Sequence, residues 1–173
     1  MSYHEVSIRP MSPTDFLLMT KWLQDEEVLQ FYGNPNDPYS YERILEKYSP
    51  RLNGEVNVPP FIVEKDTDPI GFMQSYPVKK EDAEAWGLPE NKTYVGIDQF
   101  IGEPRLWGKG IGTQMVKRFV VDIMIQKNPD GIVLDPEVYN TRAIKCYEKC
   151  GFEKVCKIEN GSKWLLAYWK SSQ

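Results

Sequence analysis

Several short segments of the chain alternate apolar and polar residues with a period of two, which is typical of half-buried β-strands. The clearest is 93–101, TYVGIDQFI, and near the end of the chain the hairpin signal Asn160-Gly161 separates two more. The pattern predicts seven strands. They are expected at 5–9, 61–64, 70–76, 93–101, 131–135, 152–158 and 163–169.

Other segments repeat their apolar positions with the period of an amphipathic helix. From Gly110 onward this ladder predicts a helix on Ile111, Met115, Phe119 and Ile123. Three more helices are expected at 12–23, 41–48 and 140–149. Ser12 followed by Pro13 is typical of a helix start, and Asn140 and Gly151 suit the two ends of the last helix.

The order of these elements predicts an α/β protein with one twisted mixed sheet of about seven strands and about four helices. Residues 33–38 and 79–91 are polar and contain Gly and Pro, so they are expected to be loops. With 173 residues, the whole chain (1–173) is expected to form a single domain that buries its own core.

Composition narrows the class of protein. Hydrophobic residues make up 41% and charged residues 27%, as in ordinary globular proteins. A net charge of -4 gives little support to a nucleic-acid partner and would suit a cationic substrate. No apolar stretch approaches the ~20 residues of a membrane span, and the first residues do not resemble a secretory signal. We therefore expect a cytoplasmic protein with no membrane partner.

The scarcity of histidine excludes several kinds of active site. His4 is the single histidine, so a Ser-His-Asp or Cys-His mechanism would have to use it. The three cysteines, Cys146, Cys150 and Cys156, are an odd number and are expected to be reduced thiols. Cys146 and Cys150 could share a helix face, but we expect them to be small helix residues and predict no metal site.

A glycine-rich segment, 105–113 (RLWGKGIGT), connects the strongest strand to the amphipathic helix. Glycines let backbone N–H groups approach an anion closely, and a helix N-terminus adds positive charge, so the expected ligand is a phosphate or pyrophosphate. The spacing matches neither the Walker A loop, GxxxxGK[ST], nor the dinucleotide fingerprint, GxGxxG. The alternative is a glycine-rich turn before a core helix.

Asp98 is an unusual residue for its strand. In strand alternation it shares a face with Gly96 and Phe100, inside an otherwise apolar segment. A carboxylate is costly there unless it has a partner or a function. It could hold an amine and accept its proton, or it could be paired to a neighbouring backbone group or cation.

Two motifs resemble those of the GCN5-related N-acetyltransferases (GNAT). Residues 105–110 (RLWGKG) fit the acyl-CoA pyrophosphate loop Q/R-x-x-G-x-G/A, and residues 140–152 fit N-x-x-A-x-x-x-Y-x-x-x-G-F. Within that superfamily the chain resembles the aminoglycoside 6′-N-acetyltransferases nearly end to end. It is most similar to the acetyltransferase half of the bifunctional acetyltransferase–phosphotransferase enzymes. Further matching stretches are 21–23, 28–29, 31–33, 69–71, 96–104, 134–136 and 142–144.

The resemblance implies that acetyl-CoA is the cosubstrate and that no metal is needed. Its pyrophosphate would lie on the glycine-rich segment, through Arg105, Trp107, Gly108, Lys109, Gly110, Ile111, Gly112 and Thr113. Backbone amides near Phe100 and Ile101 would polarise the thioester carbonyl and pair with pantetheine. Asn140 would bond the pantetheine arm or only cap its helix.

The resemblance also assigns the chemistry. Asp98 would be the catalytic carboxylate and amine anchor, and Tyr147 would protonate the departing CoA thiolate, with core packing of its ring as the alternative. The binding site for the acceptor would be lined by Trp22, Tyr32, Gln74, Tyr76, Asp98, Asp135 and Glu137. Core packing is an equal alternative for Trp22 and Tyr32. The acidic run 25–27 is expected to be a solvated end of the first helix.

The implied reaction is direct transfer of the acetyl group, in a ternary complex, to the 6′-amine of an aminoglycoside antibiotic, which makes antibiotic resistance the expected role. The alternatives are a GNAT enzyme acting on another amine (a siderophore hydroxylamine, a polyamine or a peptide N-terminus) and a CoA-binding sensor or scaffold. The acceptor is expected to be a small cationic amine, and the protein a monomer or homodimer.

Overall fold

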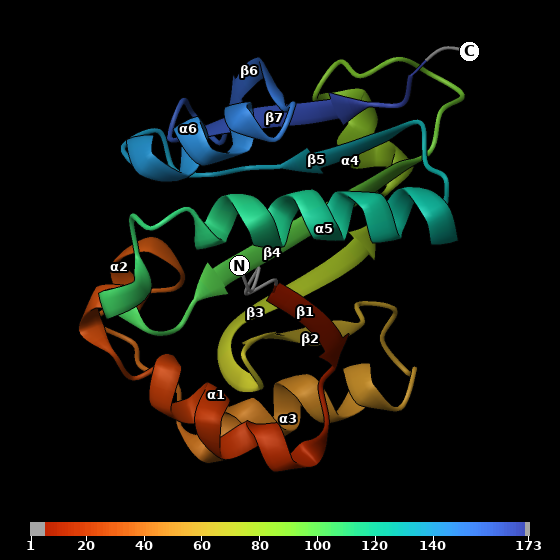
Figure 1. Cartoon of the computed structure of the whole chain (residues 1–173). Helices are drawn as coiled ribbons and strands as arrows, with labels where there is room; N and C mark the ends of the chain where they lie inside the picture. Colours follow the sequence, from red (N-terminus) through yellow and green to blue (C-terminus); the bar gives the residue numbers. More distant parts are fainter. Residues whose placement is uncertain (1–5, 172–173) are drawn as a thin grey trace. The chain divides into compact units, whose positions relative to one another are not determined.

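The computed structural model describes residues 6–171, and its strands form one seven-stranded sheet in the order β1-β2-β3-β4-β5-β7-β6 (Figure 1). The β4–β5 pair is parallel, whereas β1–β2, β2–β3, β5–β7 and β6–β7 are antiparallel, so the predicted mixed sheet is confirmed. Glu5, the expected first strand residue, and His4 lie outside the described residues. The strands are β1 (Val6–Pro10), β2 (Pro60–Lys65), β3 (Asp68–Pro77), β4 (Tyr94–Ile101), β5 (Gly131–Leu134), β6 (Glu153–Ile158) and β7 (Lys163–Trp169).

Six α-helices occur within residues 6–171, two more than the sequence predicts. They are α1 (Phe16–Trp22), α2 (Glu26–Phe31), α3 (Tyr41–Leu52), α4 (Lys80–Ala85), α5 (Ile111–Gln126) and α6 (Thr141–Lys149). Short 3-10 turns precede α1 at Pro13–Asp15 (η1) and α5 at Pro104–Leu106 (η2). No helix of the described part is long and apolar enough to cross a membrane.

The two extra helices correct the sequence-based prediction. The loop expected at 79–91 contains α4, which has no buried residue and therefore shows no apolar periodicity. The acidic run is the start of α2 and not the end of α1. The Asp25 carboxylate accepts hydrogen bonds from the backbone N–H groups of Glu27 (2.8 Å) and Val28 (3.3 Å), as an N-cap does.

The chain forms two compact units that alternate along the sequence. Unit 1 extends to Gln74 and includes Gln99–Met115, and unit 2 comprises Ser75–Asp98 and the chain from Val116 onward. Strands β3 and β4 and helix α5 each pass from one unit to the other. The single domain expected over residues 1–173 stays a prediction.

In unit 1, helices α1 and α3 lie side by side and bury large side chains (Figure 1). Trp22 and Tyr48 are fully buried, and the rings of Phe72 and Phe100 stack with centroids 5.3 Å apart. These contacts form one core together with Met11, Phe16, Met19, Leu23, Val28, Leu29, Ile44 and Ile62. Strand β3, through Phe72, and strand β4, through Phe100, are therefore anchored in this core.

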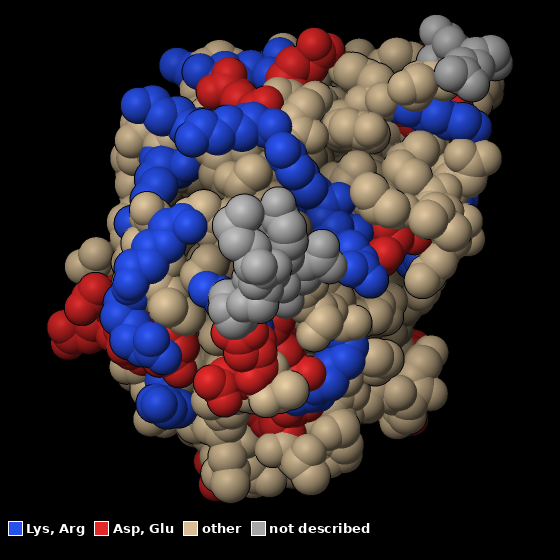
Figure 2. All heavy atoms as spheres, in the orientation of Figure 1, with Lys and Arg blue, Asp and Glu red and all other residues tan. Residues whose placement is uncertain are grey.

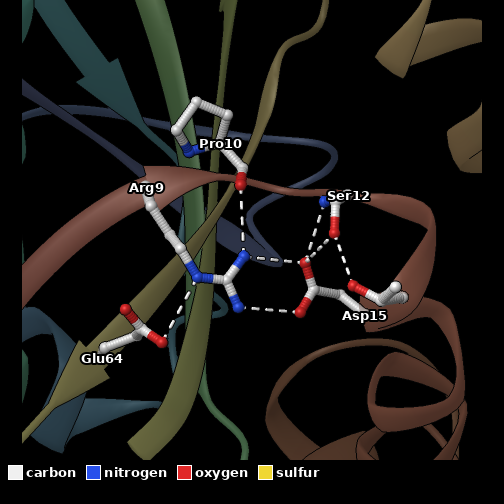
Figure 3. Close-up of polar contacts among 6 residues, drawn as sticks. Arg9, Pro10, Ser12, Asp15 and Glu64 are labelled. Atoms are coloured by element: carbon white, nitrogen blue, oxygen red, sulfur yellow. Dashed lines mark hydrogen bonds and ion pairs between the residues drawn. The ribbon is translucent and has the colours of Figure 1, made fainter. Parts of the chain in front are cut away.

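An ion-pair network connects β1 to the first helical turn in unit 1 (Figure 3). The Arg9 guanidinium donates two hydrogen bonds of 2.8 Å to the Asp15 carboxylate and lies 3.3 Å from Glu64. The Ser12 backbone N–H also donates to Asp15, at 2.8 Å. The acid three residues after Ser12 thus closes a capping box.

In unit 2, strands β4, β5 and β7 pack Tyr94, Val133, Leu165 and Ala167 into a second core. Phe119 and Ile123 of α5 are buried, as are Ile111 and Met115 in unit 1, which confirms the predicted ladder. Strands β6 and β7 form the predicted hairpin. Its turn has positive φ angles at Glu159 (51°), Asn160 (58°) and Gly161 (82°), which explains the Asn-Gly pair.

Candidate active site

The glycine-rich segment of unit 1 is an exposed loop between β4 and α5. Gly108 and Gly110 have φ angles of 74° and 81°, in the left-handed region that favours glycine. A Cβ atom at either position would meet no heavy atom within 4 Å, so the space over the loop is open. Helix α5 begins directly after it, where the Gln114 N–H donates to the Gly110 carbonyl at 3.2 Å. The geometry suits a bound anion.

Trp107 anchors this loop. Its indole N–H donates to the Ile101 carbonyl at 3.0 Å, and its ring contacts Phe31 edge-on with centroids 5.6 Å apart. Arg105 and Lys109 are exposed on the two sides of Trp107. Ile111 is buried, whereas Gly112 and Thr113 are partly exposed in the first turn of α5. Two of the predicted cations are therefore available to solvent beside the glycines.

Two of the predicted acceptor residues belong to the aromatic core of unit 1. Trp22 is only 1% exposed, packs edge-on against Phe100 at 5.9 Å and donates its indole N–H to Glu103 at 3.3 Å. A Cβ on Gly102 would overlap its indole ring. Trp22 is therefore packed as the core alternative expects, and its contact with an acceptor stays a prediction. Tyr32 is partly exposed, with its ring centroid 4.7 Å from that of Phe100.

Gln74 is buried near the end of β3. The Arg51 guanidinium of α3 donates a 2.6 Å hydrogen bond to its side-chain oxygen, and it also lies 5.5 Å from the centre of the Tyr48 ring. Gln74 and Tyr76 are two residues apart on β3, so they share a face of the strand. The structure thus gives Gln74 a cationic neighbour that the sequence does not indicate.

Strand β4 extends beyond its ladder with β5. The parallel pairing comprises Tyr94–Gly131, Val95–Ile132 and Gly96–Val133, whereas β4 continues to Ile101. Phe100 is buried and Ile101 partly buried at the end of the strand. The predicted pairing of their backbone with thioester and pantetheine stays a prediction.

The acidic part of the candidate site lies in unit 2, around Tyr76 and Asp98. The ring of Tyr76 lies directly over Gly96, where a Cβ atom would overlap two ring carbons and lie 2.5 Å from the hydroxyl oxygen. Burial, followed by the charges of Asp98, Asp135 and Asp82, raises the pKa of Tyr76 far above its ordinary value. Tyr76 is therefore a neutral hydrogen-bonding group among carboxylates at physiological pH.

Asp135 follows β5 and carries a paired carboxylate. The ammonium of Lys163, the first residue of β7, lies 3.5 Å from its Oδ2 atom. Burial raises the pKa of Asp135, Lys163 opposes that shift, and Asp98 and Glu159 add to it, so the net pKa lies above the ordinary value. Glu137 is partly buried and forms an isolated antiparallel bridge with Lys163. Tyr76, Asp98 and Asp135 are thus brought together as the sequence predicts, with a cation added.

Helix α6 carries the two remaining predicted residues. The side-chain oxygen of Asn140 accepts a hydrogen bond from the Ala143 N–H at 3.3 Å, so Asn140 caps the helix. The ring of Tyr147 is partly buried, tilted against Phe152 with centroids 6.3 Å apart. Gly151 ends the helix with a φ of 97°. The fold fixes the ring of Tyr147, and the role of its hydroxyl stays a prediction.

Three residues that contact predicted site residues were not themselves predicted from the sequence: Lys163, Arg51 and Glu103. Each contacts a predicted residue that is distant along the chain, and neither Lys163 nor Arg51 belongs to a local motif. The only signal in the sequence is the position of Lys163 directly after the hairpin turn. Within residues 6–171, no cluster of three or more His, Cys, Asp or Glu side chains is placed to hold a metal ion.

Comparison with known proteins assigns the family. The protein-family model for the acetyltransferase (GNAT) domain matches residues 12–160 of this chain. The chain is 32% identical, over 154 residues, to aminoglycoside N(6′)-acetyltransferase type 1 of Klebsiella pneumoniae, covering 88% of this chain and 76% of the relative. The chain therefore belongs to the GNAT acetyltransferase family.

Solved structures agree with this assignment. Aminoglycoside acetyltransferase AAC(6′)-Ib in complex with coenzyme A and kanamycin superposes with a TM-score of 0.78 at 27% identity, covering 96% of this chain and 95% of that one. The same enzyme with ribostamycin and coenzyme A gives a TM-score of 0.79 at 27% identity, with coverages of 96% and 94%. A kanamycin resistance protein of Rhizobium radiobacter is 42% identical over 59 residues, 34% of this chain and 55% of that protein. The finer resemblance to the bifunctional enzymes stays a prediction.

Proposed function

We propose that this protein transfers the acetyl group of acetyl-CoA to the 6′-amine of aminoglycoside antibiotics, by direct attack in a ternary complex. One observation carries the proposal. Strand β4 bears Asp98, ends at Ile101 and leads through residues 102–104 into the open glycine loop. A carboxylate for the amine and a cradle for the cosubstrate are therefore parts of one continuous segment. The likeness to N(6′)-acetyltransferases over 88% of the chain supports the same assignment.

The loop of unit 1 would hold the pyrophosphate of acetyl-CoA. Gly108 and Gly110 leave open space next to the backbone, and the start of α5 supplies N–H groups with the positive end of the helix dipole. Arg105 and Lys109 would add positive charge from the exposed surface. Trp107 would fix the loop through the Ile101 carbonyl and lie beside the bound cosubstrate.

Asp98 would receive the acceptor amine. Near neutral pH that amine arrives mainly as an ammonium, which has no lone pair for attack. Asp98 would bind the cation and take one of its protons, directly or through water. The neutral nitrogen then attacks the thioester carbonyl to give a tetrahedral intermediate with one C–N bond formed. Backbone N–H groups at Phe100 and Ile101 would stabilise its oxyanion.

Collapse of that intermediate breaks the C–S bond. The electron pair leaves with sulfur, and the Tyr147 hydroxyl would donate its proton to the CoA thiolate. The proton first taken from the amine passes from Asp98 to solvent. The nitrogen loses its second proton to water as the intermediate collapses, and Tyr147 recovers a proton from water, so that one proton in total is released. The products are the acetylamide and free CoA, so the balance needs no further reactant.

The acceptor would be a small cation, held by acids of unit 2. Asp135 and Glu137 follow β5, the charge of Asp98 acts on Asp135, and Tyr76 supplies a neutral hydroxyl. Side chains of both charge signs occupy the face drawn in Figure 2, and the net charge of the chain is -4. We place the protein in the cytoplasm, without a membrane partner, as a monomer or homodimer. None of its three cysteines forms a disulfide, which supports that location.

Acetyl-CoA turnover tests the proposal. The purified protein is incubated with acetyl-CoA and a panel of aminoglycosides, polyamines, hydroxylamines and peptide N-termini, and the release of CoA thiol is measured. We expect kcat/KM to be highest for acceptors with a 6′-amine. A higher kcat/KM for another amine would mean that the enzyme acts on a different class of substrate. Binding of CoA without turnover of any amine would favour a sensor or scaffold.

A further inference from the structure

A lysine lies inside the acidic cluster proposed to receive the acceptor. The ammonium of Lys163 is 3.5 Å from Asp135 and 3.6 Å from Glu159. The side chains of Lys163 and Asp135 are 26% and 28% exposed, so both are largely shielded from water. An ion pair at this depth is screened much less than one on the open surface.

The backbone fixes where this lysine lies. The Trp164 N–H donates to the Pro136 carbonyl at 3.0 Å, and the Val138 N–H donates to the Ser162 carbonyl at 2.9 Å. These two bonds and the bridge between Glu137 and Lys163 tie the start of β7 to the loop after β5. The lysine is therefore held opposite Asp135 by main-chain bonds on both of its sides.

The groups around Asp135 come from four elements. They are Lys163 of β7, Glu159 of the β6–β7 turn and Asp98 of β4, and the neutral Tyr76 of β3 is added by the effect of Asp135 on its hydroxyl. Burial lowers the pKa of Lys163, but Asp135, Glu159 and Glu137 raise it to a net value above the ordinary one. Lys163 is therefore cationic at neutral pH. It neutralises one of the carboxylates that the acceptor would otherwise find.

We propose that Lys163 is a specificity-determining residue. Its ammonium pairs with the Asp135 carboxylate, so the cluster binds one acceptor ammonium at Asp98 and disfavours a second ammonium on the same sugar ring of the acceptor. The inference rests on the proposed function. Its physical basis is the repulsion between like charges in a partly buried site. A second substrate ammonium near Asp135 would have to displace Lys163 or lie against it, whereas a hydroxyl would not.

The test compares two acceptors that differ in one group. Kanamycin A and kanamycin B both carry the 6′-amine, and on the same ring kanamycin A has a 2′-hydroxyl where kanamycin B has a 2′-amine. The quantity measured is the ratio of kcat/KM for kanamycin B to that for kanamycin A, by thiol release. In Lys163→Met we expect this ratio to rise by about fivefold, as for a charge interaction of ~1 kcal/mol.

Three further variants make the result specific. Lys163→Arg keeps the charge and should keep the wild-type ratio. Asp135→Asn removes the carboxylate but leaves the lysine, so it should lower the ratio. Lys170→Met removes an exposed lysine at the far end of β7 and should change nothing. Thermal unfolding of each variant establishes that it is folded before its kinetics are compared.

The outcomes separate this inference from the proposed function. If the wild type acetylates neither compound, the proposed function is wrong. If the wild type acetylates both, and folded Lys163→Met and Lys170→Met give the same ratio as the wild type, Lys163 does not select the acceptor. An equal fall of both kcat/KM values in Lys163→Met would likewise overturn the inference, because it would make the lysine a structural support only.

Discussion

The ring of Tyr76 lies over Gly96, so that a glycine on one strand makes room for the phenol of the next. Replacement of Gly96 by alanine would place a Cβ atom 2.5 Å from the hydroxyl oxygen, and this atom would overlap two carbons of the ring. Tyr76 would have to leave the position in which the charges of Asp98 and Asp135 act on its hydroxyl. We expect Gly96→Ala to lower the free energy of unfolding by about 1–3 kcal/mol, as overpacking does.

A double-mutant cycle checks this relationship. If the clash with the ring is the cause, Gly96→Ala should be much less destabilising in a Tyr76→Ala background, because the obstructing ring is gone. Denaturant unfolding of the four proteins measures the coupling. Equal destabilisation in both backgrounds would mean that position 96 needs glycine for another reason.

Gly110→Val tests the glycine loop. Valine at a φ of 81° is strained, and its branched side chain would fill the open space over the loop. We expect CoA affinity, measured by calorimetry, to fall at least tenfold. Gly54→Val is the matched control, since Gly54 has a φ of 83° and an equally open Cβ position outside the loop. If the two variants bind CoA equally well, the loop does not hold the pyrophosphate.

Tyr147→Phe tests the proposed general acid. The substitution keeps the ring that packs against Phe152 and removes only the hydroxyl. Loss of a general acid typically lowers the rate about 10²- to 10⁴-fold, so kcat should fall by that factor while the KM values change little. Steady-state kinetics with both substrates measure the split. A variant with full kcat would show that water protonates the thiolate.

Asp15→Asn tests the network that ties β1 to the first helical turn. Burial raises the pKa of Asp15, but hydrogen bonds from Arg9 and Ser12 outweigh it and bring the pKa below its ordinary value. A depressed pKa stabilises the fold above the unfolded-state pKa, about 3.9, and that stabilisation is lost as pH falls through the folded-state value. We expect a loss of about 1–3 kcal/mol at pH 7, measured by urea unfolding.

The pH dependence supplies the control for this prediction. Because the Asp15→Asn variant has no carboxylate to protonate at this position, the stability difference from the wild type should shrink below pH ~4. A difference that stays constant between pH 7 and pH 3 would mean that the charge of Asp15 does not stabilise the fold.

The elements that could be predicted are those whose own residues carry the signal. Helix α5 shows its buried ladder in the sequence, and Asp98 is conspicuous as a carboxylate in an apolar strand. Helix α4 was missed because it buries none of its residues. Trp22 was ambiguous because a large aromatic suits a core and a binding site equally, and only its contacts with Phe100 and Gly102 decide for the core.

The pairing of Lys163 with Asp135 is of a different kind. These residues are distant along the chain, and main-chain bonds between a loop and a strand start bring them together. Local periodicity and short motifs contain no information on such a contact. The acids of the site could therefore be predicted, but the cation among them could not.

The central claim is that Asp98 directs acetyl transfer to a 6′-amine. Neomycin and paromomycin form a matched pair, with a 6′-amine in the first and a 6′-hydroxyl in the second. The decisive measurement is kcat/KM for both, by release of CoA thiol, with the wild type and with Asp98→Asn, which keeps the size of the side chain and removes its charge. We predict that the wild type strongly prefers neomycin and that Asp98→Asn loses about 10²-fold or more on it. Equal acetylation of the two compounds by the wild type, or full neomycin turnover by Asp98→Asn, would contradict the claim.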